Sequence, residues 1–388
     1  MKHNTDLSII GGCGHIGLPL GLAFANKGLN VTLIDNNRNN VKLINKGICP
    51  YMEDNADTDL KKNLKKKKIF ATSDLKKIKK KKFIIICIGT PVSANFKPYL
   101  KSFFQLIKDL KKFINKNQIL IIRSSVYPGL CEKITKILNF KNICYCPERV
   151  VQGKMLVEIK NLTQIVSGYN QSSIRTAAKL FKKICKKIII TSVFEAELIK
   201  LFSNAYRYIH FAIANEFYMI CKKYSVNFNK LRKNMIDGYS RNSSLPSQGL
   251  TAGPCLLKDT MQLFSFTKNT FDLGLTSMKI NERLPIFLIN NIEKKISLKN
   301  KTVGILGLAF KAETDDIRDS LSIKLLKYLK KRKINTLQSD PFYKNEKNID
   351  AKSLIKKSDI VFIATPHNQY KKLNIPKKKI VIDVWNIL

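Results

Sequence analysis

Short apolar runs, each followed by a stretch with helical spacing, alternate along most of this chain. The first two runs cover 7–10 and 31–34, and similar runs recur at 83–88, 119–122, 302–306, 359–365 and 380–385. Strands that alternate with helices in this way are typical of parallel βαβ units. The pattern therefore predicts an α/β fold with one α/β unit in each half of the chain.

The stretch between these two units has a different pattern. Residues 195–224 carry apolar side chains three and four positions apart, which predicts one apolar stripe on a long helix: Leu198, Leu201, Phe202, Ala205, Ile209, Ala212 and Ile213. At about 1.5 Å per residue the helix would be roughly 45 Å long, enough to join two domains and to pack against a second copy. We expect domains at 1–192, 193–296 and 297–388, and a homodimer formed through this central helix.

A glycine motif follows the first apolar run. Gly12, Gly14 and Gly17 form GxGxxG between a strand and a helix, and Asp35 ends the next strand. In a dinucleotide site the first glycine permits a tight turn, the second lets the backbone approach the pyrophosphate, and the third packs the helix on the strand. Ile16 belongs to the same turn. An aspartate in the position of Asp35 binds a ribose diol and repels a 2′-phosphate, so we expect NAD as the cofactor.

Polar residues follow three further strands. Thr90 comes after the run at 83–88, Ser125 after the run at 119–122, and Glu148 with Arg149 after a short strand near 144. Open parallel sheets bind ligands at the carboxyl ends of their strands. These side chains are therefore candidates for a site, although either hydroxyl could also belong to ordinary turn chemistry.

Two polar groups on or after the long helix are further candidates. Lys200 and Asn204 lie one turn apart and would point from the same side of it, although a solvated lysine is the simpler interpretation of Lys200. Cys255 is followed by Lys258 and Asp259, and a helix N-terminus beside a cation favours a reactive thiolate. A single cysteine is otherwise more often a small buried apolar residue.

Charge and cysteine content limit the other classes of function. The chain has 70 Lys and Arg against 28 Asp and Glu, a formal net charge of +42, which suggests nucleic-acid binding. Lysine is spread over almost every segment instead of lining one face, so we expect no nucleic-acid partner.

The nine cysteines form no CxxC pair, and we propose neither disulfides nor a metal site. We expect a cytoplasmic protein without a membrane segment, because the chain shows no apolar signal region and no sufficiently long apolar run.

Taken in order, the motifs resemble the UDP-glucose/GDP-mannose dehydrogenase family over nearly the whole chain. They are GxGxxG with Asp35, Ser-Ser-Val-Tyr-Pro-Gly at 124–129, Cys-Pro-Glu-Arg at 146–149, Lys200 with Asn204, Gly-Pro-Cys-Leu-Leu-Lys-Asp at 253–259, Gly-Leu-Ala-Phe-Lys at 307–311 and Asp-Asp-Ile-Arg-Asp-Ser at 315–320. The resemblance implies two Rossmann-like doubly wound domains joined by a long central helix, the first binding NAD and the last binding the nucleotide sugar. It also implies oxidation of the sugar C6 alcohol to a carboxylate with two NAD⁺, for surface polysaccharide biosynthesis.

The resemblance assigns roles by position. It implies Cys255 as the nucleophile that forms a thiohemiacetal and then a thioester, with Lys200 and Asn204 stabilising oxyanion charge. It implies proton transfer and thioester hydrolysis by a set of three residues: Asp259, Glu148 and Ser125. It implies contacts with the nucleotide sugar or the cofactor for a further set: Lys311, Arg149 and Gly253 near the substrate, Arg241 reaching the neighbouring subunit's substrate, and Arg318 near the cofactor.

This chain departs from the family at a few positions. Ser125 replaces a frequent threonine, Gln152 replaces a glutamate found in some relatives, and Ala252 and Leu257 lie in an altered cysteine loop. The resemblance implies that the last two lie beside the sugar, so the sequence leaves open whether the sugar nucleotide is UDP-glucose, a UDP-N-acetylhexosamine or GDP-mannose, and we expect a UDP-sugar. Two rival functions are a two-electron dehydrogenase of the hydroxyacid type and a catalytically inactive basic scaffold that binds nucleic acid.

Overall fold

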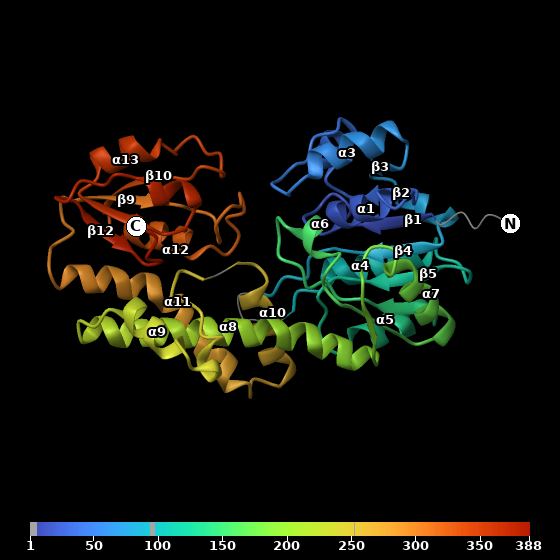
Figure 1. Ribbon diagram of the computed structural model, residues 1–388. Coiled ribbons are helices and arrows are strands. Elements are labelled where there is room, and N and C mark those ends of the chain that lie inside the picture. The colour runs from blue at the N-terminus through green and yellow to red at the C-terminus, as the bar shows by residue number, and fades with distance from the viewer. Residues whose placement is uncertain (1–5, 94–97, 252) are drawn as a thin grey trace. The chain divides into compact units, whose positions relative to one another are not determined.

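The computed structural model describes residues 6–93, 98–251 and 253–388 (Figure 1). Ala252, one of the departures from the family pattern, lies outside these residues. The chain forms two compact units, one ending at Phe202 and the other comprising Ser203–Leu388. The predicted division into three domains, at 192/193 and 296/297, stays a prediction.

The first unit contains an eight-stranded sheet with the order β3-β2-β1-β4-β5-β6-β7-β8. All neighbouring strands are parallel except β6 and β7. In this order β1 lies beside β4, where the strand order reverses, as in a doubly wound sheet, and the strand–helix alternation predicts such a fold. The strands are β1 (Leu7–Ile10), β2 (Val31–Ile34), β3 (Ile69–Thr72), β4 (Phe83–Ile86), β5 (Ile119–Ile122), β6 (Ile143–Tyr145), β7 (Gln164–Gly168) and β8 (Ile188–Ile190).

Helices cover both faces of this sheet because successive strand residues point to opposite sides. Leu7 and Ile9 of β1 belong to a core shared with α1 and α7, whereas Ile10 belongs to a second core shared with α4 and α5. The central strands are therefore buried at every position, the polar Ser8 and Thr32 included, instead of alternating between buried and exposed residues. The helical segments are α1 (Gly17–Ala25), α2 (Arg38–Asn45), α3 (Ala56–Lys65), η1 (Leu75–Lys80), α4 (Lys101–Lys111), α5 (Leu130–Leu138), α6 (Met155–Glu158) and α7 (Gln171–Phe181).

The long helix predicted at 195–224 is α8, Val193–Lys223. Its apolar residues divide between two sides of the helix instead of forming the single stripe that the sequence suggests. Leu201, Ala205 and Ala212 are buried, whereas Phe202 and Ile213 are exposed. The exposed residues belong to one row at helical spacing, here called the α8 apolar row: Phe202, Tyr206, Ile213, Phe217, Ile220 and Tyr224.

The second unit contains a four-stranded parallel sheet with the order β10-β9-β11-β12. Its strands are β9 (Thr302–Leu306), β10 (Asn335–Ser339), β11 (Ile360–Ile363) and β12 (Ile380–Asp383). The helical segments after α8 are α9 (Phe228–Ile236), η2 (Ser240–Asn242), α10 (Leu256–Phe266), α11 (Asp272–Glu293), α12 (Leu321–Lys331), α13 (Ala351–Lys357) and η3 (Asn368–Lys372). The α/β fold with two parallel sheets and a long central helix is thus confirmed.

Among the described helices, none combines the length and apolar character required to cross a bilayer.

Candidate active site

The predicted cofactor site begins at the glycine turn between β1 and α1. A β-carbon on Gly17 would lie 2.2 Å from Gly11 O, and one on Gly12 would lie 2.6 Å from Ile9 O, so neither position accepts a side chain. A β-carbon on Gly14 would meet only Gly11 O, at 3.5 Å, which leaves the backbone there accessible. The residue with the left-handed conformation is Gly11, at φ +74°, so the tight turn that the sequence pattern assigns to Gly12 is made by its neighbour.

Asp35 follows β2 and reaches back to the glycine turn. Its Oδ2 accepts a hydrogen bond from Cys13 N at 3.0 Å, and its Oδ1 accepts one from Asn37 N at 3.0 Å. Ile16 is the N-cap residue of α1, so the positive end of this helix lies at the same turn. An open glycine backbone, a helix N-terminus and a carboxylate after the next strand fit the pyrophosphate and ribose of a dinucleotide.

Thr90 and Ser125 follow the neighbouring strands β4 and β5, and the fold brings them together. The Thr90 hydroxyl donates a hydrogen bond to the backbone carbonyl of Ser125, and Thr90 is buried. Because β4 and β5 are parallel, both residues lie at the edge of the sheet where such folds bind ligands.

Glu148, after β6, is held by a buried guanidinium. Its Oε2 pairs with Arg123, and its Oε1 accepts hydrogen bonds from Arg149 N at 2.7 Å and Val150 N at 2.9 Å. The guanidinium of Arg149 in turn donates to Thr163 O at 2.5 Å. Both oxygens of Glu148 are therefore bonded within the protein, and Arg149 is tied to the backbone.

Lys200 and Asn204 lie one turn apart on α8, and both are buried. The simpler interpretation of Lys200 as a solvated surface lysine therefore does not hold. Asn204 Nδ2 donates to Asp259 Oδ2 at 2.5 Å, and Lys258 Nζ lies 2.9 Å from Asp259 Oδ1. The Asp259 side chain is fully buried, so the second unit contains a carboxylate held between an amide and an ammonium group.

Cys255 is the N-cap residue of α10, and Asp259 lies in the first turn of that helix. The cysteine is thus at the positive end of a helix, as its sequence context predicts. All nine cysteines are free, and Cys255 alone among them is exposed. Burial raises the pKa of Cys13 and Cys87 to about 12.

The loop after β9 carries the predicted substrate lysine, Lys311. It lies against Gly253 in the loop that leads to Cys255, here called the cysteine loop. Gly253 has φ +113°, and a β-carbon there would lie 2.5 Å from the ring of Phe310. Arg318 is bound to Asp316 by three side-chain hydrogen bonds of 2.6 to 3.0 Å, and these bonds raise the pKa of Arg318.

Arg241 lies in η2 and is exposed. Its guanidinium contacts Tyr239, 3.5 Å from the hydroxyl. The structure therefore does not join Arg241 to the Cys255 and Asp259 cluster within one chain.

Four buried ionisable residues that the sequence interpretation overlooked organise these segments. Arg123 holds Glu148, and Glu197 on α8 accepts hydrogen bonds from the backbone at the start of α5. Asp340 and His367 bind the loop that carries Lys311. Only Arg123 directly follows an apolar run, at the end of β5. Glu197 lies within the long helix and Asp340 follows the partly polar strand β10, so the local pattern carried no signal for them.

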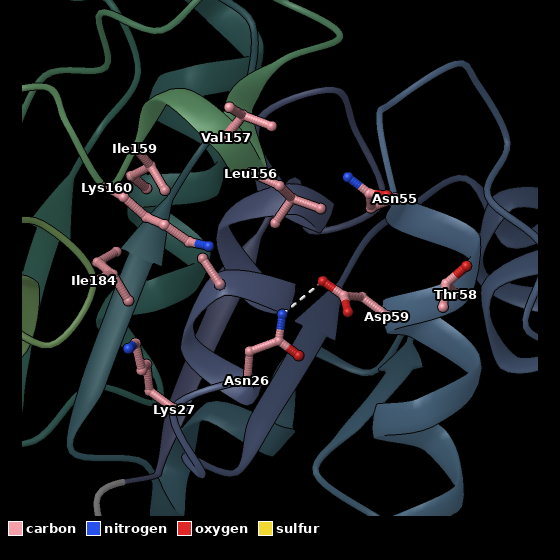
Figure 2. A pocket seen from close by; sticks show the side chains of 11 residues that line it. Asn26, Lys27, Asn55, Thr58, Asp59, Leu156, Val157, Ile159, Lys160 and Ile184 are labelled. Carbon is pink, nitrogen blue, oxygen red and sulfur yellow. Dashed lines mark hydrogen bonds between the residues drawn. The ribbon is translucent and has the colours of Figure 1, made fainter.

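A hollow in the first unit lies apart from this chemistry. Its volume is about 370 Å³, and it is lined by residues of α3, α6 and the carboxyl end of α1 (Figure 2). Asn26, after α1, donates to Asp59 of α3 at 2.6 Å there. The glycine turn lies at the other end of α1, roughly 13 Å away at 1.5 Å per residue, so this hollow is not the cofactor site. No group of three or more His, Cys, Asp or Glu suited to a metal ion occurs among the residues that the structure describes.

Three models of one family match this chain. The NAD binding domain of the UDP-glucose/GDP-mannose dehydrogenase family matches residues 5–186, its central domain matches 194–283, and its UDP binding domain matches 304–388.

Named relatives match over nearly the full length. UDP-N-acetyl-D-mannosamine dehydrogenase of Pyrococcus horikoshii is 29% identical over 97% of this chain and 94% of its own. UDP-glucose 6-dehydrogenase of Rickettsia felis is 29% identical over 97% of this chain and 91% of its own. The solved structure of UDP-D-ManNAc dehydrogenase from Pyrococcus horikoshii superimposes with a TM-score of 0.91 at 29% identity, covering 99% of this chain and 96% of that one. The resemblance that the motifs suggest is thus confirmed, as is NAD as the cofactor: the chain belongs to the UDP-glucose/GDP-mannose dehydrogenase family and is an NAD-dependent nucleotide-sugar dehydrogenase.

Proposed function

We propose that this enzyme oxidises the C6 hydroxymethyl group of a UDP-sugar to a carboxylate, with Cys255 as a covalent nucleophile. The balanced reaction consumes one alcohol, two NAD⁺ and one water, and yields one carboxylate, two NADH and three protons. NAD⁺ supplies the electron acceptor in both oxidations. The observation that carries this proposal is an exposed cysteine at the N-terminus of α10, one turn before a buried carboxylate bound to Asn204.

Cys255 attacks the aldehyde produced by the first oxidation. The thiolate sulfur forms a bond to the carbonyl carbon, and the carbonyl oxygen takes up a proton to give a thiohemiacetal. In the second oxidation the thiohemiacetal loses a hydride, which carries two electrons, and its hydroxyl proton, and becomes a thioester. Water then cleaves the carbon–sulfur bond and restores the thiol. The helix N-terminus supports the sulfur as an anion, and Arg318 is close enough to interact electrostatically with it.

Lys200 and Asn204 stabilise the oxygen anion in these steps. Both are buried, and donors in a site with little water stabilise developing charge more strongly than they do in solution. Asp259 fixes the orientation of the Asn204 amide through their 2.5 Å hydrogen bond and accepts a proton during thioester hydrolysis. Ser125 contributes a hydroxyl at the strand end beside Thr90.

Glu148 acts in this proposal as a fixed negative charge. Its oxygens already accept bonds from Arg123 and from two backbone amides, so we assign proton transfer to Asp259 instead. The Arg123 pair also keeps the backbone of Arg149 in place, which we propose as a substrate contact.

The substrate is a UDP-sugar, either a UDP-N-acetylhexosamine or UDP-glucose. The match to a UDP binding domain at 304–388 supports the nucleotide, and the names of the relatives support both sugars. We propose that Lys311 and the backbone of Gly253 bind the nucleotide sugar and that Arg318 lies near the cofactor. The product, a uronic acid still attached to UDP, would serve polysaccharide biosynthesis.

We further propose that two copies pair through the α8 apolar row. Phe202, Tyr206 and Tyr224 are 52%, 58% and 67% exposed in the single chain, which is unusual for aromatic residues on one helix face. Pairing would also place Arg241 beside a neighbouring subunit. Light scattering should give a dimer mass for the wild type, and Tyr206→Glu should shift it toward the monomer; a wild-type monomer at assay concentration would refute the pairing.

The experiment that tests the reaction counts NADH per sugar consumed. Purified enzyme is incubated with NAD⁺ and limiting UDP-N-acetylmannosamine, UDP-N-acetylglucosamine, UDP-glucose or GDP-mannose, and the products are identified by mass spectrometry. We expect two NADH and one uronic acid per molecule of one UDP-sugar. A ratio of one would favour the two-electron rival.

Two substitutions at Cys255 examine the covalent step. Cys255→Ala should abolish acid formation, since no sulfur remains to hold the aldehyde carbon. Cys255→Ser should accumulate an ester detectable by intact-protein mass, because an oxygen ester is hydrolysed more slowly than a thioester. Cys221→Ser, at a buried cysteine far along α8, is the control and should retain the two-to-one ratio. Full acid formation by Cys255→Ala would leave Cys255 without a catalytic role.

A further inference from the structure

The loop from Gly307 to Glu313, here called the β9 loop, follows β9 and carries Phe310 and Lys311. Its first residues are bound by a buried carboxylate: Leu308 N and Ala309 N donate to Asp340 Oδ2 at 2.6 and 3.1 Å. The other oxygen, Oδ1, accepts hydrogen bonds from the backbone after β10, so Asp340 joins two loops. Burial alone raises the pKa of Asp340, but hydrogen bonds from His367 and from these backbone amides lower it to about 2.

His367 contacts the last residue of the β9 loop directly and is linked to its first residues through Asp340. Its Nε2 lies 3.3 Å from Asp340 Oδ2, the oxygen that binds the first residues of the loop. Its Nδ1 accepts a hydrogen bond from Glu313 N, the last residue of the loop, at 3.1 Å. An Nδ1 that accepts leaves the ring proton on Nε2, where it is directed at Asp340, so one neutral imidazole satisfies both contacts.

The surroundings of His367 leave its ring no freedom to reorient. The side chain is fully buried, with its ring centroid 5.0 Å from that of Phe342 and 5.5 Å from that of Tyr370. The carboxylate of Glu313 lies 3.8 Å from Nδ1 and accepts a hydrogen bond from Asn368 N, which attaches the loop end to the residue after His367. The histidine is therefore a rigid part of the second unit and not a surface group.

The opposite side of the β9 loop faces the cysteine loop. The Phe310 ring occupies the space that a side chain at Gly253 would need, two residues before Cys255. A displacement of the β9 loop would thus move the proposed substrate lysine and the wall of the cysteine loop together.

We propose that His367 is a positioning residue for nucleotide-sugar binding, which clamps the β9 loop by bonding to Asp340 at its start and to Glu313 at its end. This inference rests on the proposed function through the role of Lys311. His367 itself touches neither substrate nor cofactor in this proposal. Its contribution is to hold the loop in the binding geometry before the nucleotide sugar arrives, which lowers the cost of binding.

Two substitutions of His367, by asparagine and by glutamine, each remove one of its two contacts and keep the other. The amide of asparagine reaches as far as Nδ1 of histidine, so His367→Asn keeps an acceptor for Glu313 N and loses the bond to Asp340. The amide of glutamine reaches as far as Nε2, so His367→Gln keeps the bond to Asp340 and loses the one to Glu313. Hydrogen exchange should show the Glu313 amide exchanging about tenfold faster in His367→Gln and His367→Ala than in the wild type or His367→Asn.

Kinetics then connect the clamp to binding. His367→Ala should raise KM for the UDP-sugar about tenfold and leave KM for NAD⁺ within twofold, with His367→Asn and His367→Gln intermediate. Ser358→Ala is the control, because it removes a buried hydrogen bond to Leu354 O in the same unit. Ser358 precedes β11, whereas the β9 loop follows the parallel strand β9, so the two lie at opposite ends of the sheet. It should change neither constant by more than twofold.

The outcomes are distinguishable from those of the proposed reaction. Equal effects of His367→Ala and Ser358→Ala on KM, or parallel rises in KM for the UDP-sugar and for NAD⁺, would overturn the positioning role. If His367→Ala does not fold, the asparagine and glutamine variants decide the question by the same exchange pattern. If the wild type oxidises no UDP-sugar, the proposed function fails, while exchange at Glu313 still tests the clamp in the protein alone.

Discussion

Removal of the Arg123 guanidinium should destabilise the first unit more than any surface substitution. The side chain of Arg123 is 1% exposed and that of its partner Glu148 is 10% exposed. The guanidinium also donates to Cys146 O at 3.1 Å and to Gln164 Oε1 at 2.9 Å. Arg123→Met keeps most of the volume and a favourable contact with the Phe181 ring, whose centroid lies 5.1 Å from Arg123 Cζ, but it leaves the Glu148 carboxylate without its cation.

The magnitude follows from what remains in the core. Removing one member of a buried ion pair costs roughly 3–5 kcal/mol, because the other charge stays buried without compensation. Two neutral acceptors also lose a donor, at about 1 kcal/mol each. Loss of the buried Arg123 Nε, which has no hydrogen-bond partner in the described part of the chain, offsets part of that cost. We therefore expect Arg123→Met to lower the free energy of unfolding of the first unit by about 4 kcal/mol.

The double variant Arg123→Met/Glu148→Met supplies the decisive comparison. With both charges removed, most of the loss should be recovered, and the double variant should be within about 2 kcal/mol of the wild type. Trp385 is the chain's only tryptophan and belongs to the second unit, so its fluorescence does not report on the substitution. The stability of the first unit is measured instead by hydrogen exchange of the β5 and β6 amides in increasing urea. A single-variant cost below about 1 kcal/mol, or a double variant as unstable as the sum of the singles, would refute the electrostatic account.

Two further predictions concern the first unit. Asp35→Ala should weaken NAD⁺ binding and narrow the preference over NADP⁺, because it removes both the ribose partner and the acceptor for Cys13 N; equal use of the two cofactors by the wild type would contradict this. Burial raises the pKa of Glu53 to about 7, so the stability associated with its neutral form is present below the unfolded value near 4.5 and is lost as the pH rises through 7. Glu53→Gln should therefore raise the urea midpoint at pH 8 relative to wild type and change it little at pH 5, whereas equal shifts at both values would exclude this linkage.

Local pattern was sufficient for eight of the twelve described strands and for the position of the cofactor turn, and it missed β3, β7, β8 and β10. β1, β2 and β5 begin and end at the residues where their apolar runs do, because each run is bounded by turn residues and buried on both faces. β3 and β10 were not predicted, since Ile69–Thr72 and Asn335–Ser339 contain exposed or polar positions at the edges of their sheets.

The hydrogen bonds and ion pairs that hold the site residues could not be predicted from local sequence pattern. The family motifs identified Cys255, Asp259 and Asn204, but the bond between Asn204 and Asp259 joins positions 55 residues apart. Arg123 and Glu148 are separated by 25 residues, and Asp340 and His367 by 27. Which buried charge meets which partner depends on how strands are ordered in the sheet, and that order is a property of the whole unit.

The distribution of cysteines gives this enzyme a single readily accessible thiol, that of Cys255. Eight of its nine cysteines are buried or half-buried and one, at a helix start, is exposed. An alkylating reagent added in one molar equivalent should therefore modify one position and leave the others intact. A reporter group or an affinity tag can be attached there without engineering, and the same position should be the first thiol that peroxide oxidises, because oxidation of cysteine requires access to the sulfur.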